Sequence, residues 1–285
     1  MKLLGLFAAL IALAPSSFAQ PKRIVSTAPS ITEILFALGL GDRVVGVTTF
    51  CRYPAEALNR PKIGTYYEPN FEAILAARPD VVFVVKNPVR FKEKLEGMGL
   101  RVVELAGENL AGIAESIRLV ATTAGMPERA VKLNASIATE LASIRKNVAG
   151  RTKPKFLFVI GRTPGRLEGL FVAGRDNFLN ELIGIAGGVN AFADLAQSYA
   201  KVPLEEVLAR NPEVILDIGD MADTANVPAE KVRATVALWS AVPSLAAVKN
   251  GRVHATPADY FFVAGPRVAE AARAFVRLLH PEIAR

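Results

Sequence analysis

Tyrosine and phenylalanine residues recur in short loop-like stretches of this sequence, and arginines lie near some of them. Tyr66 and Tyr67 lie in "TYYEPN", Tyr199 lies in "SYAKVP", and Asp259 begins the stretch "DYFFV". Aromatic rings stack on flat molecules at a low conformational cost, and guanidinium groups bind anionic groups. These residue types indicate recognition of a large flat ligand.

Residue patterns typical of catalysis do not occur in the sequence. The two histidines, His254 and His280, lack the His-Glu-x-x-His spacing of a zinc enzyme, and there is no Gly-x-Ser-x-Gly or phosphate-binding loop. His254 falls in a predicted strand, so we interpret it as a buried strand residue. We therefore expect a binding protein, with no catalytic residues, no bound metal and no cofactor.

The candidate ligand contacts lie where predicted strands end, which is where α/β domains bind ligands. A single tyrosine there is also typical of a half-buried surface residue. Tyr66 and Tyr199, however, are separated by 133 residues within matching stretches, and this match favours a functional role. The candidates from these loops are Phe50, Tyr66, Tyr67, Tyr199, Asp259, Tyr260 and Phe261, with Arg162 and Arg166 for anionic groups.

The same offset of 133 residues relates two longer stretches, "TYYEPNFEAILAARPDVVFVV" and "SYAKVPLEEVLARNPEVILDI". Besides the tyrosines, it aligns Glu72 with Glu205 and Pro79 with Pro212. The sequence therefore contains the same pattern of turn, helix start and strand twice, which predicts two similar domains. A carboxylate in a first helical turn is favourable by about 0.3–1 kcal/mol through the helix dipole. The matched positions further indicate docking to a partner with two-fold symmetry.

Short Val-rich strands alternate with amphipathic helices in both halves, which is the pattern of a parallel sheet. The first half begins with a strand over residues 23–27 and a helix that Ser30 or Thr32 could cap, with Glu33 in its first turn. The second half begins with a strand over residues 155–160 and ends with a helix in "PRVAEAARAFVRLLH".

A long helix is predicted from Met126 to Val148, with an apolar stripe that includes Val131, Leu141 and Ile144. At 1.5 Å per residue it would be roughly 33 Å long. We interpret it as a rigid connector, the alternative being an ordinary surface helix of one domain. The expected organisation is a signal peptide at 1–19, an N-terminal lobe at 20–125, the connecting helix at 126–149 and a C-terminal lobe at 150–285.

The N-terminus has the features of a secretory signal peptide: Lys2, an apolar run from Leu3 to Ala14, and small residues Ser17 and Ala19 before the cleavage point. The run is shorter than the roughly 20 residues that a membrane span needs. Cys51 is the only cysteine, so the exported chain has no internal disulfide. The net charge of +7 is scattered rather than clustered, which argues against binding of nucleic acid.

The stretch "RIVSTAPSITEILFALGLGDRVVGVTTFCRYPAEA", with "NFEAILAARPDVVF" and the mid-chain helix, resembles the periplasmic substrate-binding proteins of cobalamin, siderophore and haem ABC importers. The resemblance covers essentially the whole mature chain and is closest to the cobalamin-binding branch. It implies two Rossmann-like α/β lobes with parallel sheets joined by one long helix. It further implies a periplasmic monomer that holds cobalamin or a similar metal chelate between the lobes and delivers it to a permease dimer with its ATPase.

Several candidate residues match positions that line the cleft in cobalamin-binding relatives. They are Phe50, Tyr66, Tyr199 and the stretch from Asp259 to Val263, which adds Phe262 and Val263 to the candidates. The sequence departs from that pattern in having Tyr where Trp is frequent and an apolar pair, Phe262 and Val263, where a more polar pair is expected.

The resemblance leaves the ligand and the partner open. In a haem-binding relative, Tyr66 or Tyr67 would be an iron ligand, so haem and siderophores remain alternatives to cobalamin. Glu72 and Glu205 match the glutamates that dock onto permease arginines in this family. A ligand sensor that docks to a membrane receptor is the remaining alternative.

Overall fold

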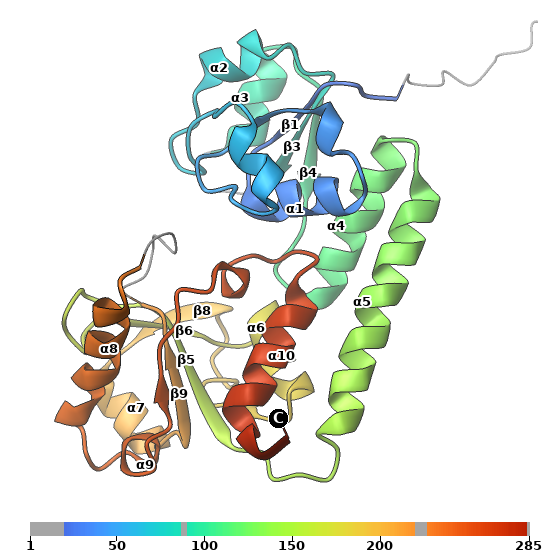
Figure 1. The fold of residues 1–285 in the computed structure, drawn as a ribbon. Coiled ribbons are helices and arrows are strands. Elements are labelled where there is room, and N and C mark those ends of the chain that lie inside the picture. The colour runs from blue at the N-terminus through green and yellow to red at the C-terminus, as the bar shows by residue number, and fades with distance from the viewer. Residues whose placement is uncertain (1–19, 87–89, 220–226, 284–285) are drawn as a thin grey trace, which may run out of the picture.

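Two α/β lobes and a long helix that runs beside both of them make up the protein (Figure 1). The computed structural model describes residues 20–86, 90–219 and 227–283, so the predicted signal peptide lies outside the described residues. Within them, no helix combines the length and the apolar character that crossing a membrane requires. The predicted two-lobed α/β fold is confirmed.

A four-stranded parallel sheet with the order β2-β1-β3-β4 forms the centre of the N-terminal lobe. Its short Val-rich strands are mostly buried, as expected for a parallel sheet covered on both faces. The strands are β1 (Ile24–Ser26), β2 (Val44–Val47), β3 (Val81–Val85) and β4 (Val102–Leu105). The helices are α1 (Pro29–Ala37), α2 (Phe71–Ala76) and α3 (Phe91–Gly97), with 3₁₀ turns η1 (Gly41–Arg43) and η2 (Ala55–Asn59).

The sheet of the C-terminal lobe has the order β10-β9-β5-β6-β8, and β7 also pairs with β5. β10, β9 and β5 pair in parallel, whereas β6 pairs antiparallel with both β5 and β8, so this sheet is mixed. The short connection between β5 and β6 forces that reversal, because a parallel pair needs a long crossover. The strands are β5 (Lys155–Gly161), β6 (Leu170–Ala173), β7 (Val189–Asn190), β8 (Tyr199–Val202), β9 (Val214–Asp217) and β10 (Val253–His254).

Five helices and three 3₁₀ turns cover the described part of this second sheet. The helices are α6 (Phe178–Ile185), α7 (Leu204–Arg210), α8 (Ala229–Leu238), α9 (Ala246–Lys249) and α10 (Val268–Leu279). The 3₁₀ turns are η3 (Trp239–Ala241), η4 (Asp259–Phe261) and η5 (Pro281–Ile283). The upper end of α10 and the neighbouring η4 face the N-terminal lobe, on the side where α1 lies (Figure 1).

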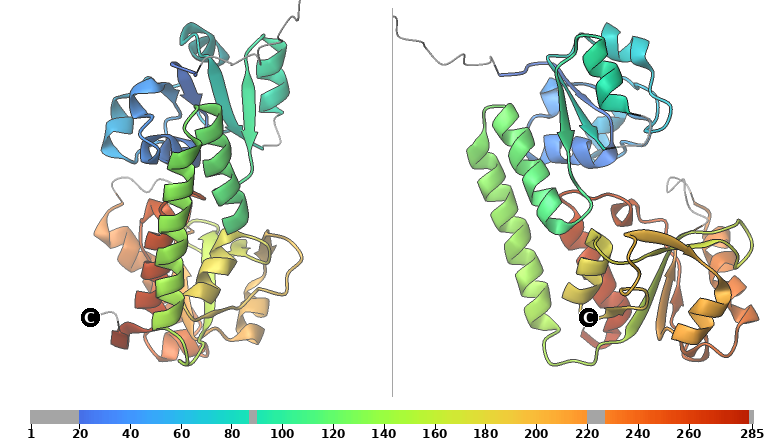
Figure 2. Two further views of the ribbon diagram at one scale, coloured as in Figure 1. Left: turned by 90° about the vertical axis from the view of Figure 1, so that its right-hand side faces the viewer. Right: turned by 180° about the vertical axis from the view of Figure 1, so that it is seen from behind.

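The connecting helix α5 spans Pro127–Asn147 and runs along one side of both lobes (Figure 2). It forms an antiparallel pair with α4 (Leu110–Thr123), so the link between the lobes is a helical hairpin rather than one isolated rod. Leu141 and Ile144 are buried as predicted, but Val131 is 69% exposed and does not belong to the apolar stripe. The helix turns Val131 to solvent because it packs on α4 and α10 along its opposite side.

The internal repeat corresponds to the same structural unit in each lobe, α2–β3 and α7–β9. At the offset of 133 residues, the N-cap Asn70 matches the N-cap Pro203, and the left-handed Arg78 (φ 44°) matches the left-handed Asn211 (φ 45°). The acid that precedes β3 or β9 also makes the same bond in each lobe, to the start of the neighbouring strand β1 or β5. Asp80 accepts the backbone N–H of Arg23 at 2.8 Å, and the matching Glu213 accepts that of Lys155 at 2.8 Å.

The start of α1 differs from the sequence-based expectation. Its N-cap is Ala28, which makes no side-chain capping bond, and Ser30 and Thr32 cap nothing. Thr32 is buried instead and bonds to the Ser26 hydroxyl at 2.7 Å and to the Cys51 thiol at 3.0 Å. Glu33 lies one turn into the helix and is only 3% exposed, so it is not a solvent-exposed first-turn acid. Thr32 and Glu33 therefore take part in buried tertiary contacts and do not cap the start of α1.

Candidate ligand-binding site

A cavity of about 600 Å³ lies between the two lobes. Its N-terminal wall comes from the segments that follow β1, β3 and β4, with Tyr66 from the loop before α2, and its C-terminal wall comes from the segment that follows η4. Strand ends thus supply one wall, as α/β architecture predicts. The lining residues are Ala28, Pro29, Ser30, Tyr66, Val85, Lys86, Leu105, Ala106, Gly107, Glu108, Asn109, Gly112, Phe262, Val263 and Ala264.

A smaller cavity of about 190 Å³ adjoins the first and shares Pro29, Phe262 and Val263 with it. The remaining lining residues are Glu33, Phe50, Arg52, Tyr53 and Asp259. Phe50 and Tyr53 are each 45% exposed, and Phe262 is 39% exposed. Large aromatic side chains gathered in this exposed state mark a surface that meets a ligand or a partner.

Tyr66 lies in the main cavity, and its hydroxyl donates a hydrogen bond to the carbonyl of Lys86 at 2.9 Å. Its ring contacts the Tyr67 ring edge to face, with 4.9 Å between the ring centres. Burial, with a smaller effect from Tyr67, raises the pKa of Tyr66, so the phenol stays protonated near neutral pH. Tyr67 itself is 69% exposed at the rim and lines neither cavity.

The remaining predicted aromatic contacts separate into different environments. Phe262 and Val263 line both cavities, whereas Tyr199 and Tyr260 are half-buried and line neither. Burial, with a smaller effect from the charge of Glu108, raises the pKa of Tyr199 to about 12, and Glu108 is the cavity residue next to it. Tyr199 therefore lies near the cavity without lining it.

Phe261 is a correction to the predicted contacts, because it is only 1% exposed. Its ring packs against Phe158 and Phe275 of the C-terminal core, with 5.5 and 5.0 Å between ring centres. The backbone turn at η4 directs neighbouring side chains to opposite sides, so Phe261 points into the core while Phe262 remains exposed at the cleft. A sequence of three adjacent aromatic residues cannot by itself show which one faces the core.

The two predicted arginines also lie outside the cavities. Arg162 has a fully buried side chain, and its Nε donates to Asp217 at 2.9 Å inside the C-terminal lobe. Asp217 also accepts from the indole N–H of Trp239 at 2.9 Å, so the Arg162 guanidinium belongs to an internal network and not to a ligand. Arg166 is exposed and lies 3.8 Å from Glu168 in the β5–β6 connection.

Sequence reasoning predicted Asp259, which lines the smaller cavity, but missed the ion pair between Glu33 and Arg267 that joins the lobes beside it. Arg267, which precedes α10, donates from Nε and Nη2 to both carboxylate oxygens of Glu33 at 3.0 and 2.5 Å, and from Nη1 to Asp259 at 2.8 Å. The Tyr53 ring centre lies 4.1 Å from the guanidinium carbon. Burial, against the opposing effect of Arg267, raises the pKa of Glu33 to about 7.

Two further contacts join the lobes on the α4 side of the cavity. The backbone N–H of Phe178 donates to the Glu108 carbonyl at 2.7 Å, and the Leu110 N–H donates to the Glu181 carboxylate at 2.6 Å. Ser30, Lys86, Glu108 and Asn109 supply polar groups to the main cavity. The only sequence signal for them was their position directly after strands.

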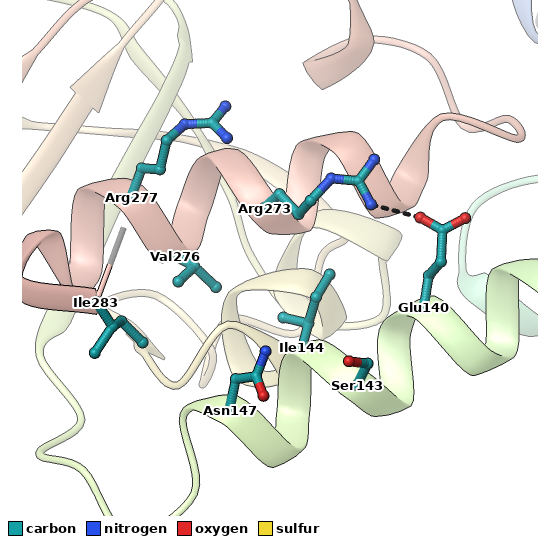
Figure 3. A pocket seen from close by; sticks show the side chains of 8 residues that line it. All are labelled: Glu140, Ser143, Ile144, Asn147, Arg273, Val276, Arg277 and Ile283. Carbon is teal, nitrogen blue, oxygen red and sulfur yellow. Dashed lines mark hydrogen bonds and ion pairs between the residues drawn. The ribbon is translucent and has the colours of Figure 1, made fainter. Parts of the chain in front are cut away.

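A third hollow, of about 590 Å³, lies between α5 and α10 and shares no lining residue with the two cavities (Figure 3). Arg273 of α10 meets Glu140 of α5 across it at 2.5 Å, and Arg277 lies farther along α10. It consists of surface helix faces and takes no part in the cleft. Among the described residues, no group of three or more His, Cys, Asp or Glu is placed to hold a metal ion.

Comparisons with known proteins agree with a site between two lobes. The family model described as "Periplasmic binding protein" matches residues 24–260, which is most of the chain. The chain belongs to the periplasmic binding protein family. Members of this family are binding proteins that work with ABC transporters and bind small ligands.

Individual relatives in this family are similar along nearly their whole length. The vitamin B12-binding protein of Vibrio cholerae serotype O1 is 29% identical over 265 residues, covering 91% of this chain and 90% of that protein. The crystal structure of the periplasmic vitamin B12-binding protein of Vibrio cholerae superposes with a TM-score of 0.75 at 27% identity, covering 93% of this chain and 98% of that one.

A haem-binding relative is about as similar as the vitamin B12-binding one. The periplasmic haem-binding protein of Roseiflexus sp. RS-1, in its apo form, has a TM-score of 0.75 at 28% identity, covering 91% of this chain and 99% of that one. The overall similarity therefore does not distinguish between the two kinds of ligand, and the residues that line the cavity must decide.

Proposed function

We propose that this protein captures cobalamin or a similar metal chelate between its lobes in the periplasm and delivers it to an ABC permease dimer with its ATPase. The observation that carries the proposal is the interlobe cavity, lined by strand-end segments of one lobe and by Phe262 and Val263 of the other. A flat macrocycle offers large faces to such walls, and stacking and burial dominate its recognition.

The cavity wall favours a corrinoid over a haem that is bound through tyrosinate. An iron–phenolate bond to Tyr66 would require breaking the hydrogen bond that its hydroxyl donates to the Lys86 carbonyl at 2.9 Å. Tyr67 is exposed but lies directly against Tyr66, so haem is the second candidate ligand. Relatives that bind vitamin B12 and relatives that bind haem support these two candidates in turn.

The experiment is an absorbance titration of the mature protein with cyanocobalamin and, separately, with haemin. We expect saturable binding of cyanocobalamin with a stoichiometry of one, and haemin without the charge-transfer band of an iron–tyrosinate. Tyr66→Ala and Phe262→Ala should each weaken cyanocobalamin binding by about 1–3 kcal/mol, as for aromatic anchors at other interfaces. Leu58→Ala, at an exposed apolar residue outside both cavities, is the control and should bind as the wild type.

The competing outcomes are distinct. A tyrosinate band with haemin that disappears in Tyr66→Phe or in Tyr67→Phe would replace cobalamin with haem as the ligand. Absence of binding to both compounds, with an intact fold, would leave a siderophore or a receptor-docking sensor as the function. Unchanged affinity for cyanocobalamin in Tyr66→Ala and Phe262→Ala would show that this cavity is not the ligand-binding site.

Docking to the permease is proposed for Glu72 and Glu205. Both side chains are exposed in the first turns of α2 and α7. These helices lie one on each lobe, on the side of the molecule opposite α5 (Figure 1 and the right-hand view of Figure 2). A permease dimer presents each of its basic patches twice, so one acidic group per lobe is complementary to it.

A further inference from the structure

Arg267 connects the two walls of the ligand cavity although it lines neither the main cavity nor the smaller one. Asp259 and Arg267 are the two ends of the segment that contains Phe262 and Val263, and one edge of the guanidinium donates a hydrogen bond to Asp259. The other edge holds both carboxylate oxygens of Glu33 in α1. The first turn of that same helix contributes Pro29 and Ser30 to the opposite wall of the cavity.

The segment between Asp259 and Arg267 is therefore closed at its base by an ion pair and is kept tight internally. The Phe262 N–H donates to the Asp259 carbonyl at 2.9 Å, and the Gly265 N–H donates to the Val263 carbonyl at 2.9 Å. A Cβ atom at Gly265 would lie 3.5 Å from a Glu33 oxygen and 3.6 Å from the Ser30 Cα. Both are ordinary van der Waals distances, so the segment lies directly against α1 with little more than the width of a methyl group between them.

The contact is built as a rigid joint. The side chains of Glu33 and Arg267 are 2% and 11% exposed, and a bidentate guanidinium–carboxylate pair fixes both distance and orientation. Tyr53, from the N-terminal lobe, covers the guanidinium with its ring. Glu270 is 4.0 Å from Arg267 but is 46% exposed and belongs to the same lobe, so it adds charge without joining the lobes.

We infer that Arg267 is a positioning residue of the ligand site, which sets the separation of the two cavity walls by holding Glu33 and Asp259 at once. It acts through the placement of Phe262 and Val263 against Pro29 and Ser30, and it does not touch the ligand. The inference rests on the proposed function for the ligand, but the placement of the lobes is a property of the protein alone and is measurable without ligand.

The test measures the interlobe distance and the affinity separately. Spin labels on Glu96→Cys in α3 and Ala234→Cys in α8, both exposed positions, report the distance distribution between the lobes by pulsed electron resonance. Cys51 is 0% exposed and stays unlabelled. Arg267→Lys keeps the positive charge but loses the fork that bonds three oxygens. Glu33→Ala breaks the contact between the lobes and leaves the Asp259 bond in place; because Glu33 also lines the smaller cavity, the distance distribution of this variant, measured without ligand, carries its part of the test.

In the apo protein, we expect both variants to shift or broaden the interlobe distance distribution, and we expect cyanocobalamin to bind at least about 10-fold more weakly. The matched control is Arg273→Lys in α10, which likewise replaces a guanidinium that pairs with a glutamate, in this case the exposed Glu140 of α5 outside the cleft. Its distances and affinity should equal those of the wild type. Thermal unfolding checks the fold of each variant, and Glu33→Ala carries the test if Arg267→Lys does not fold.

Wild-type distances in a folded Arg267→Lys or Glu33→Ala protein would overturn the inference, whatever happens to affinity. A changed distance distribution with wild-type cyanocobalamin affinity would also overturn it, because the position of the walls would then be irrelevant to binding. If the wild type binds no cyanocobalamin while the variants shift the distances, the choice of ligand fails and the role of Arg267 in placing the walls is supported.

Discussion

Glu33 is a carboxyl group whose side chain is 2% exposed at the junction of the two lobes. Its pKa of about 7 in the folded protein is higher than the ordinary value of 4.5, mainly because of burial. The folded state therefore binds a proton in a pH range where the unfolded chain has already released it. The resulting difference in bound protons makes the free energy of unfolding depend on pH.

We expect the free energy of unfolding to fall as pH rises from about 4.5 to about 7, by on the order of 3 kcal/mol from this group. Glu33→Gln removes the titration, so that part of the slope should disappear. Urea unfolding of both proteins at a series of pH values measures it. An identical pH dependence in Glu33→Gln would show that other groups cause the slope.

Asp217 is a second buried carboxylate, and its hydrogen bonds stabilise the C-terminal lobe. It is fully buried, and it accepts hydrogen bonds from Arg162, from Trp239 and from the backbone of Gly219, each at 2.9 Å. Asp217→Ala should destabilise the protein by about 3–5 kcal/mol, because it leaves a buried guanidinium without its carboxylate. Trp239 is the only tryptophan, so its fluorescence follows the unfolding.

The control for Asp217 is Glu168→Ala. Glu168 lies 3.8 Å from Arg166, and both side chains are about two-thirds exposed, so its loss should cost at most about 1 kcal/mol. Equal losses in the two variants would contradict the assignment of the Arg162–Asp217 pair to the core of the C-terminal lobe.

At the scale of elements, the duplicated α2–β3 and α7–β9 units present one exposed first-turn glutamate each. A helix-dipole role explains an acid near each helix start, and Glu93 in the first turn of α3 is such an acid outside the repeated unit. Glu93 is therefore the matched control for a docking role.

The double variant Glu72→Ala, Glu205→Ala should keep its ligand affinity, because both residues lie outside the cavities. Transport by the cognate importer reconstituted in vesicles should be slowed or abolished, and the loss should depend on salt, because exposed charges steer association and are screened. Glu93→Ala should transport as the wild type. Normal transport by the double variant at physiological ionic strength would contradict the docking role and leave only a helix-dipole role for both glutamates.

At the scale of the whole molecule, the described contacts tie the lobes together on both flanks of the cavity. The Glu33–Arg267 pair lies on one flank, and the Phe178–Glu108 and Leu110–Glu181 bonds lie on the other, with α5 alongside. Opening the lobes widely would break all of these contacts. The connection is also a packed helical hairpin rather than a flexible pair of strands, so we expect only a small movement of one lobe against the other.

We expect ligand to change the overall dimensions only slightly. Small-angle scattering with and without cyanocobalamin measures this, and the curves should nearly superpose beyond the contribution of the ligand itself. A large compaction on binding would indicate hinge closure of the kind seen in binding proteins with flexible crossovers, and would contradict the rigid connection.

The sequence alone determined the local order of the fold. Periodicity and turn residues predicted the alternation of strands and helices, and the offset that aligns Tyr66 with Tyr199 predicted a duplicated unit, found as α2–β3 and α7–β9. The long mid-chain helix was also predicted within one residue at each end. These features depend on backbone preferences and on side-chain spacing, both of which are readable over a few turns or strands.

Tertiary structure decided which side chains face the cleft and which charges meet. Phe261 and Phe262 are neighbours of similar chemistry, yet one is buried and the other exposed, because the turn of η4 against the core fixes their directions. Glu33 and Arg267 are 234 residues apart and belong to different lobes. No local pattern encodes such a contact, because its free energy depends on burial and on geometry that exist only once the two lobes are packed together.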